Sequence, residues 1–264
     1  MPKASKPSPR YASDILAWEY DQRQPLPLPR EMEWYQKYSP DYDNPILELA
    51  CGSGRLLVPI AQVGHKIHGV DSSLAMLNRL QQKLTALEEK IFGNISLFHS
   101  DILEFKPSKA YELVMIAYNS VREFETAEKV AACFKHVHNL LSPGGYFLFT
   151  IRRLIPSSAS GEETQVYNSI DKPFTDPTKE ISVGVRITSC SDSNHRMVNK
   201  HSYIIESRNQ PAKKIDFVTY TNMLDKVDYE KILDNLAFQI KAYGGYDECP
   251  DDERSKEICF VCRK

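Results

Sequence analysis

Short apolar runs alternate with segments of helical spacing between residues 46 and 151. The runs that we expect to form strands are 46–50, 66–70, 95–99, 111–117 and 146–151. Helical spacing of apolar residues predicts helices over 55–63, over a segment holding Leu77, Leu80 and Leu84, and over 127–141. Strands that alternate with helices form parallel sheets covered on both faces, so this stretch predicts an α/β fold.

The pattern changes after Ile151. Polar and apolar residues alternate over 165–170, 181–188, 197–206 and 214–220, with Ser, Asp and Asn turns between the runs. Such alternation is typical of antiparallel strands with one solvated face. A helix near 229–236 and strands over 238–243 and 257–262 are expected to follow. Upstream of the sheet, aromatic residues mark two expected helices, one over 11–20 and one holding Met32, Trp34 and Tyr35.

These patterns divide the chain into four expected parts. Residues 1–40 hold a tail and two helices, and 41–155 hold the parallel sheet. Residues 156–225 hold inserted antiparallel strands, and 226–264 hold the last helix and strands. A chain of 264 residues can bury one sizeable core and still carry such an added region.

The first apolar run ends in a turn with two closely spaced glycines, Gly52 and Gly54. Glycine has no Cβ, so such a turn can take positive φ and bring its backbone close to a ligand. The helix that begins behind the turn points free N–H groups at the same place. The sequence therefore predicts a nucleotide-like cofactor at this turn.

Three carboxylates stand near successive strand ends: Glu48, Asp71 and Asp101. Asp71 follows Gly54 by seventeen residues, at the tip of the second strand, where a carboxylate can accept both hydroxyls of a ribose. A dinucleotide-binding turn would have a third glycine where this chain has Leu57, which argues against a nicotinamide cofactor. A ligand with a ribose, an adenine amino group and a cationic amino-acid tail would use all three carboxylates. The expected cofactor is therefore S-adenosylmethionine.

With these residues the chain resembles the class I S-adenosylmethionine-dependent methyltransferases of the small bacterial type. The segments that carry the resemblance are 46–55, 69–76, 100–102, 117–124, 141–149 and 243–264. The resemblance implies a Rossmann-like, mostly parallel sheet of seven strands, completed by the C-terminal strands, with the last strand antiparallel. It also implies an N-terminal helical lid. The inserted strands would form a platform over the active-site mouth or a dimer surface.

The resemblance also implies roles for individual residues. The turn from Glu48 to Gly54 would hold the methionine portion of the cofactor. Asp71 would bind the ribose hydroxyls, Asp101 would accept from the adenine amino group, and Tyr118 would line the methyl-transfer end. The expected cofactor-binding residues are Glu48, Ala50, Gly52, Gly54, Arg55, Asp71, Ser72, Met76, Asp101, Ile102, Tyr118, Asn119, Tyr11 and Tyr20.

Three positions depart from the family pattern. Ala50 replaces the usual first glycine of the turn, and alanine is small enough for the cost to be slight. Ser72 stands where the family usually has an apolar residue against the adenine, so that contact is expected from Met76 or Leu74. Glu123 stands where similar sequences often have a histidine or another neutral polar residue.

Methyl transfer from a sulfonium is an in-line displacement whose leaving group needs no proton. The protein must therefore align the reactants and exclude water. An amine acceptor must be neutral to react, and Glu123 is the candidate for holding or deprotonating it, with Tyr118 also at the reaction centre. Arg152 is a candidate for binding an anionic substrate group, and Tyr246 for reaching the mouth from a turn. A solvated surface role is the alternative for Glu123 and Arg152.

The sequence thus predicts a methyltransferase that acts on an amine nitrogen of a small molecule. Three alternatives remain open: transfer to oxygen or carbon, action on tRNA, and a sensor or partner subunit that binds the cofactor without catalysis. A nicotinamide oxidoreductase is disfavoured because of Leu57 and because a catalytic Tyr/Lys or His pattern is missing.

Charge and composition limit the partners. The formal net charge is −2 and no basic run occurs, which argues against a nucleic-acid substrate. No apolar run reaches membrane-spanning length and the first ten residues hold no secretory core, so a cytoplasmic protein is expected. The six cysteines then need no disulfides. Cys259 and Cys262 would face opposite sides of a strand, so no metal site is expected. A homodimer through the inserted strands is a further expectation.

Overall fold

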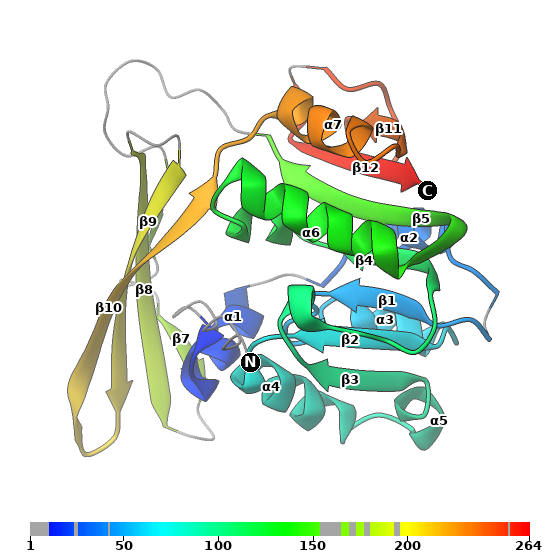
Figure 1. Ribbon diagram of the computed structural model, residues 1–264. Coiled ribbons are helices and arrows are strands. Elements are labelled where there is room, and N and C mark those ends of the chain that lie inside the picture. The colour runs from blue at the N-terminus through cyan, green and yellow to red at the C-terminus, as the bar shows by residue number, and fades with distance from the viewer. Residues whose placement is uncertain are drawn as a thin grey trace.

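The computed structural model describes residues 11–23, 26–41, 43–153, 165–168, 173–176, 180–192, 196–252 and 254–264. Within these ranges the chain forms two sheets, with helices on and between them (Figure 1). None of the helices in the described ranges combines the length and the hydropathy needed to cross a bilayer.

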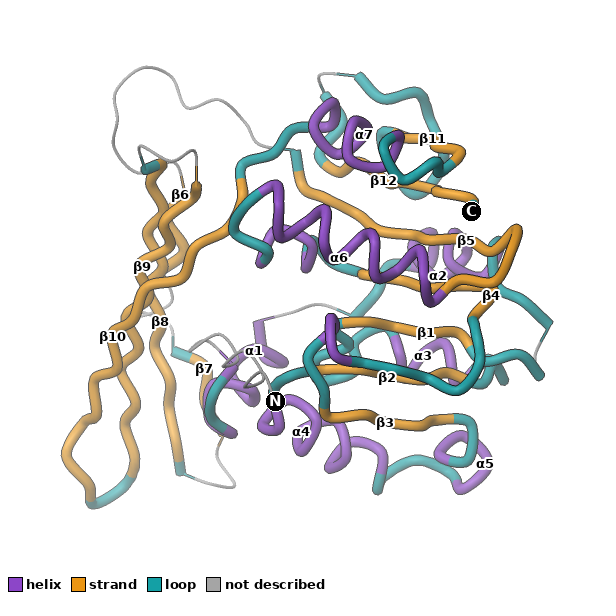
Figure 2. The backbone as a smooth tube through the Cα atoms, viewed as in Figure 1, coloured by secondary structure: helices purple, strands orange, loops and turns teal. Residues whose placement is uncertain are grey.

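The larger sheet has seven strands in the order β11-β12-β5-β4-β1-β2-β3 (Figure 2). β12 is antiparallel to both of its neighbours, and the other pairs are parallel. This confirms the Rossmann-like α/β fold with an antiparallel last strand. The strand bounds are β1 Ile46–Leu49, β2 Ile67–Asp71, β3 Ile95–His99, β4 Tyr111–Ile116, β5 Leu141–Arg152, β11 Gln239–Tyr243 and β12 Glu257–Arg263.

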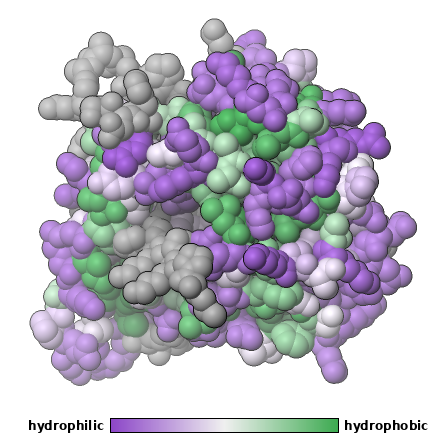
Figure 3. Space-filling model, in the orientation of Figure 1, coloured by the Kyte–Doolittle hydropathy of each residue, from purple (hydrophilic) through white to green (hydrophobic). Residues whose placement is uncertain are grey.

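Helices cover both faces of this sheet. Apolar residues of α6 (Ala127–Leu140) and α7 (Lys226–Asp234) pack on one face. Those of α2 (Pro29–Lys37), α3 (Leu57–Gln62) and α4 (Leu74–Leu84) pack on the other. The short α5 (Glu89–Phe92) precedes β3. The surface on the side of α6 is mostly hydrophilic with small apolar patches, as expected where amphipathic helices turn their apolar stripe inward (Figure 3).

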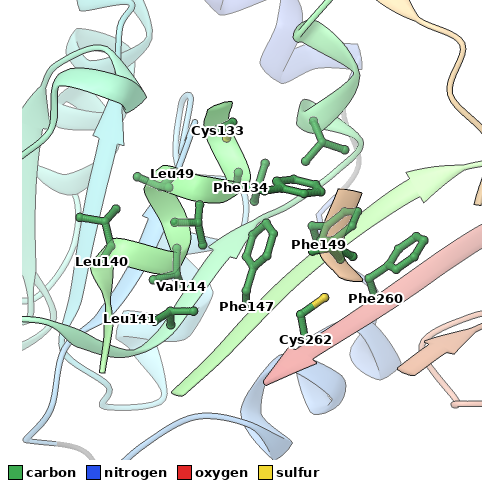
Figure 4. Packing of buried hydrophobic residues seen from close by; sticks show 14 of the residues in the cluster. Leu49, Val114, Cys133, Phe134, Leu140, Leu141, Phe147, Phe149, Phe260 and Cys262 are labelled. Atoms are coloured by element: carbon green, nitrogen blue, oxygen red, sulfur yellow. The ribbon is translucent and has the colours of Figure 1, made fainter. Parts of the chain in front are cut away.

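An aromatic cluster fills the core beneath α6 (Figure 4). Phe149 of β5 and Phe260 of β12 stack with ring centroids 4.5 Å apart, and Phe134 of α6 lies 4.9 Å from Phe149. Tyr229 of α7 packs against the same two strands. Burial of each ring stabilises the fold by about 1.5–3 kcal/mol, so the cluster fastens the C-terminal strands to the middle of the sheet.

The smaller sheet is antiparallel, as the alternating pattern predicts. Its strands are β6 Gln165–Asn168, β7 Phe174–Asp176, β8 Ile181–Ser191, β9 Arg196–Ser207 and β10 Gln210–Asn222. Their order is β10-β9-β8-β6, with β7 also paired to β8. We call this the inserted sheet. Its buried face contacts Leu16 and Trp18 of α1 (Asp14–Arg23), so α1 lies between the two sheets (Figure 1). The sequence patterns do not predict this contact.

Hydrogen bonds from two buried side chains fix the inserted sheet to the core. Asn222 at the end of β10 donates from Nδ2 to the carbonyl oxygens of Val121 at 3.0 Å and Phe124 at 2.8 Å. In return, Arg122 donates from Nη1 to the carbonyl oxygen of Asn222 at 3.1 Å. Its Nη2 reaches the carbonyl oxygen of Arg152 at 2.9 Å. The ends of β10 and β5 are therefore held in one arrangement.

Some elements differ from the predicted ones. β5 begins at Leu141 instead of residue 146, because Leu141 already pairs with Tyr111 of β4. The strand β7 and the short α5 have no counterpart among the predicted elements. α7 begins at Lys226, ahead of the expected start, because Asp225 caps it and accepts from the backbone N–H of Asp228.

Candidate active site

The turn after β1 has three residues in the left-handed region: Ala50 at φ 56°, Gly52 at 54° and Gly54 at 80°. An ideal Cβ on Gly54 would lie 2.4 Å from Leu80 Cδ1, so α4 packs directly against this turn. Both the backbone conformation and the close packing require glycine at position 54. The structure thus gives the glycine turn the shape that the sequence predicts.

Ala50→Gly should stabilise the protein by about 1 kcal/mol, because alanine at Ala50 pays a steric cost in the left-handed region that glycine avoids. Thermal unfolding should therefore show a higher Tm for this variant. Ala86→Gly, at an exposed position with negative φ, is the control and should lower the Tm. A lower Tm for Ala50→Gly would show that the strain at Ala50 is negligible.

Leu57 occupies the position of the missing third glycine, and the strand beside it compensates. The Leu57 side chain is fully buried, and an ideal Cβ on Gly69 of β2 would lie 2.4 Å from its Cδ1. The close approach of helix and strand is therefore supplied by a glycine on the strand instead of one on the helix.

Asp71 at the end of β2 joins the turn to the next helix. Its Oδ2 accepts from the backbone N–H of Gly52 at 2.7 Å, and its Oδ1 accepts from that of Ser73 at 2.8 Å. Burial raises the pKa of Asp71 above its usual value, and these two N–H donors oppose that effect. Each carboxylate oxygen keeps a further acceptor site, which is what the two hydroxyls of a ribose require. Ser73, and not Ser72, caps α4.

Glu48 is a buried carboxyl with an unused oxygen. Its side chain is 3 % exposed, and Oε2 has no hydrogen-bond partner in the described part of the chain. Burial raises the pKa of Glu48 to about 8, and Arg55 counteracts this only in part. A buried acceptor without a partner fits the amino group of the methionine portion of S-adenosylmethionine, since an ammonium would satisfy it.

Arg55 is engaged with protein groups. It forms a buried ion pair with Glu31 of α2, with Nη1 3.0 Å from Oε2, and its guanidinium lies 4.2 Å from the ring centroid of Tyr118. Arg55 thus orients Tyr118 through a cation–π contact. The sequence predicts a cofactor-binding role for Arg55, and in this structure its guanidinium contacts Glu31 and Tyr118.

The expected adenine end is built from the end of β3 and the start of α4. Asp101 accepts from the backbone N–H of Leu103 at 2.8 Å, and the half-buried Ile102 packs on the core. Met76 is buried and shares an apolar cluster with Tyr11 and Tyr20, whereas Leu74 is 54 % exposed. Of the two residues expected to supply an apolar surface against the adenine, Met76 is therefore the better placed.

Tyr118 and Asn119 follow β4 in the left-handed region, at φ 53° and 68°. For a tyrosine such a conformation costs about 1–3 kcal/mol, and it persists only where the surroundings impose it. Asn119 is held by its Oδ1, which accepts from the backbone N–H of Arg152 at 2.8 Å. The turn therefore presents Tyr118 at the carboxyl end of the strands, where ligands bind in such sheets.

A cavity of about 380 Å³ lies beyond Tyr118, and we call it the acceptor cavity. Its walls come from the strand ends of the core, from α1 and the residues before it, and from the inserted sheet. The inserted sheet contributes hydrogen-bonding groups: Ser189 donates to Asn199 Oδ1 at 2.7 Å, and His201 Nε2 lies 2.9 Å from Thr219 Oγ1. The residues that line the acceptor cavity include Tyr11, Tyr20, Arg23, Tyr118, Asn119, Glu123, Thr150, Arg152, Ser189, Asn199, His201, Thr221 and Glu257.

Comparison with known proteins agrees with this geometry. Residues 46–145, which span the glycine turn, Asp71, Asp101 and Tyr118, match the sequence family described as "Methyltransferase domain". Over this central segment the chain is therefore similar to methyltransferase domains. A putative methyltransferase of Bacillus subtilis, YqeM, is 23% identical over 240 residues, which cover 90% of this chain and 91% of that protein.

Solved structures share the fold of this chain along nearly its whole length. An S-adenosylmethionine-dependent methyltransferase from Clostridium acetobutylicum superimposes with a TM-score of 0.72 at 18% identity, over 95% of this chain and 98% of the other. The sugar N-methyltransferase KedS8 from Streptoalloteichus gives 0.71 at 16% identity, over 93% and 92% of the two chains. The inserted sheet and the N-terminal helices are therefore included in the shared architecture.

The helix α1 is tied to the glycine turn through Asp21. This carboxylate accepts from the hydroxyl of Ser53, and it forms ion pairs with Arg79 at 2.7 Å and Lys83 at 3.1 Å. The hydroxyl of Ser73 donates to the carbonyl oxygen of Tyr11. α1 thus covers the cofactor side of the site, as the expected lid would.

The expected substrate residues have different positions. Glu123 lines the acceptor cavity, and Tyr11 donates from its hydroxyl to Glu123 Oε1 at 3.5 Å. Arg152 also lines the cavity. Tyr246, expected to reach the mouth, is 7% exposed and packs against Trp34 and Tyr35 of α2, and it hydrogen-bonds with Thr150, which lines the cavity.

Several residues of the candidate site are not predicted from the sequence. Asp21 and Arg122 join elements that are distant in the sequence, and nothing in their local patterns distinguishes them from other surface charges. His201 stands in a strand with ordinary alternation. Of these residues, Glu257 is the one that the sequence could have indicated. It is the first residue of the last strand, which runs antiparallel, so it lies at the edge of the sheet where β5 ends.

Proposed function

We propose that the enzyme transfers the methyl group of S-adenosylmethionine to an amine nitrogen of a small polar molecule. The observation that supports this most is the position of Glu123, whose carboxylate lines the acceptor cavity beside Tyr11 and on the same turn as Tyr118. A carboxylate there attracts a cationic amine and can take its proton before the displacement. S-adenosylmethionine supplies the activated methyl group when bound.

The shape of the cavity supports a small acceptor. A volume of about 380 Å³ is within the usual range for small-molecule sites, and the inserted sheet and α1 enclose it on two sides. Enclosure excludes water, which would otherwise solvate the amine. The hydroxyl, amide and imidazole groups on the inserted sheet suit a hydroxylated acceptor, and the sugar N-methyltransferase KedS8 has the same fold.

Glu123→Gln tests this function. It should lower kcat by about 100-fold on an amine acceptor, because the amide can neither attract nor deprotonate the ammonium. Turnover is measured as S-adenosylhomocysteine released over a panel of primary amines, alcohols and thiols. Glu33→Gln, on the exposed face of α2, is the control and should leave turnover unchanged.

Two results would contradict the proposal. One is turnover of alcohols or thiols with no turnover of any amine. The other is a Glu123→Gln variant that turns over amines as fast as the parent while its Tm and its affinity for S-adenosylhomocysteine are also unchanged.

A further inference from the structure

Two opposite charges stand side by side at one end of the acceptor cavity. Arg152 of β5 and Glu257 of β12 are register partners on neighbouring antiparallel strands, and both line the cavity. Partners in such a pair have Cβ atoms about 5 Å apart, so their side chains leave the sheet on the same face. An ion pair between them is within reach, yet the described side chains do not form one.

Arg152 differs in this from the other arginines that line the cavity. Arg23 pairs with Glu19 at 2.9 Å, and Arg153 pairs with Asp251 and donates to the carbonyl oxygen of Ser255. Arg122 donates to backbone carbonyls, as described above. Within the described ranges, the guanidinium of Arg152 takes part in no hydrogen bond and no ion pair, so all its donors are available.

The side chain of Glu257 also has no hydrogen-bond or ion-pair partner within the described ranges. It is half-buried, and its carboxylate accepts no hydrogen bond from a described residue. Burial, together with the charge of Glu31, raises the pKa of Glu257, and Arg152 opposes that shift. The carboxylate is therefore open to a ligand that donates to it, in place of water.

The backbone beneath both charges is fixed. The N–H of Arg152 donates to Asn119 Oδ1 at 2.8 Å, and the carbonyl oxygen of Arg152 accepts from Arg122 at 2.9 Å. Glu257 is held by its strand pairing with β5. Binding groups mounted on rigid elements lose less entropy on binding, so this pair is suited to recognition.

We propose that the acceptor has a carboxylate next to a hydrogen-bond donor, with the carboxylate bound by Arg152 and the donor, an ammonium or a hydroxyl, bound by Glu257. The guanidinium fork matches a carboxylate in two parallel hydrogen bonds. A phosphate dianion fits less well, because Glu257 would repel its second charge. This inference rests on the proposed function, since it describes the acceptor of the same cavity, and it narrows the amine to an amino-acid-like one.

Binding is tested without turnover, on the protein saturated with S-adenosylhomocysteine. Saturation-transfer NMR compares four probes of similar size: β-alanine, propylamine, propionate and O-phosphoethanolamine. β-Alanine should bind most tightly, because it alone pairs a donor with a carboxylate. In Arg152→Gln its affinity should fall by about tenfold or more, and in Glu257→Gln it should fall toward that of propionate. Arg254→Gln, whose side chain is 94% exposed, is the control and should bind like the parent.

The inference is overturned if β-alanine gives no saturation transfer, if propylamine or O-phosphoethanolamine binds as well as β-alanine, or if Arg152→Gln binds β-alanine like the parent. The Tm of each variant shows whether it is folded. If Arg152→Gln is unfolded, Arg152→Lys takes its place in the test. Arg152→Lys keeps the charge but loses the fork, so it should bind β-alanine with an intermediate affinity. The proposed function is contradicted by a different result, the absence of amine turnover. The binding test and the turnover test therefore distinguish a wrong inference from a wrong function.

Discussion

Asp71→Ala should weaken the binding of S-adenosylhomocysteine by about 100-fold or more while the protein stays folded. The carboxylate already holds the turn through Gly52 and the start of α4 through Ser73. Its remaining acceptor sites are the ones expected to receive the ribose hydroxyls. Each hydrogen bond to a charged group contributes about 1.5–3 kcal/mol, and two such bonds account for at least the stated loss.

Isothermal titration calorimetry measures this affinity, and far-UV circular dichroism with thermal unfolding reports the fold. Asp71→Asn keeps one carbonyl oxygen and should give an intermediate loss, which separates the removal of acceptors from a distorted turn. Asp43→Ala removes an exposed carboxylate that pairs with Lys66, and its affinity should match that of the parent. A fall of less than threefold in Asp71→Ala would overturn the ribose assignment.

The affinity for S-adenosylhomocysteine should rise about tenfold between pH 6 and pH 7, because of Glu48. In the free protein burial holds the pKa of this carboxyl at about 8, so it is mainly protonated over this range. An ammonium placed against it favours the ionised form and lowers that pKa. Binding therefore releases a proton below pH 8, and the affinity rises with pH until Glu48 is ionised in the free protein too. Above pH 8 the rise should end, since the amino group of the ligand then loses its own proton.

Proton release is measured by calorimetry at pH 6.5 in two buffers that differ in ionisation enthalpy. The parent should release about one proton per ligand bound, and Glu48→Gln should release none and bind more weakly. Glu33→Gln is the matched control and should behave like the parent. Equal apparent enthalpies in the two buffers for the parent would contradict the role given to Glu48.

The same carboxyl should make the unliganded protein less stable as the pH rises. A folded-state pKa above the unfolded value favours the folded state at low pH, and that contribution is lost between about pH 4.5 and pH 8. Glu48→Gln removes the ionisable group, so its Tm at pH 8 should exceed that of the parent.

The central sheet and the cofactor side of the site can be predicted because their signals are local. The glycine turn, Asp71 at the end of β2 and the helical repeat of α4 are each recognised from residues that are close together in the sequence. Their geometry follows from strand and helix periods alone. The start of α4 also follows from a local signal, since Ser73 next to the end of β2 caps the helix.

Positions that depend on distant segments cannot be predicted in this way. Tyr246 stands in a turn with two glycines, a pattern typical of an exposed loop, but Trp34 and Tyr35 of α2 bury its ring. Arg55 directly follows the cofactor turn in the sequence, but Glu31 occupies its guanidinium. In each case the partner lies on another element, and pairwise contacts across a fold leave no trace in local periodicity.

The helix α1 contacts both the glycine turn and the acceptor cavity. Asp21 holds it to Ser53 in the turn for the methyl donor, Trp18 holds it to the inserted sheet, and Tyr20 is a wall of the acceptor cavity. A displacement of α1 would therefore expose the glycine turn and open the acceptor cavity together, and a small acceptor would be retained only once the helix had returned. Kinetically, this favours a compulsory order in which the donor binds before the acceptor and the methylated product leaves before S-adenosylhomocysteine.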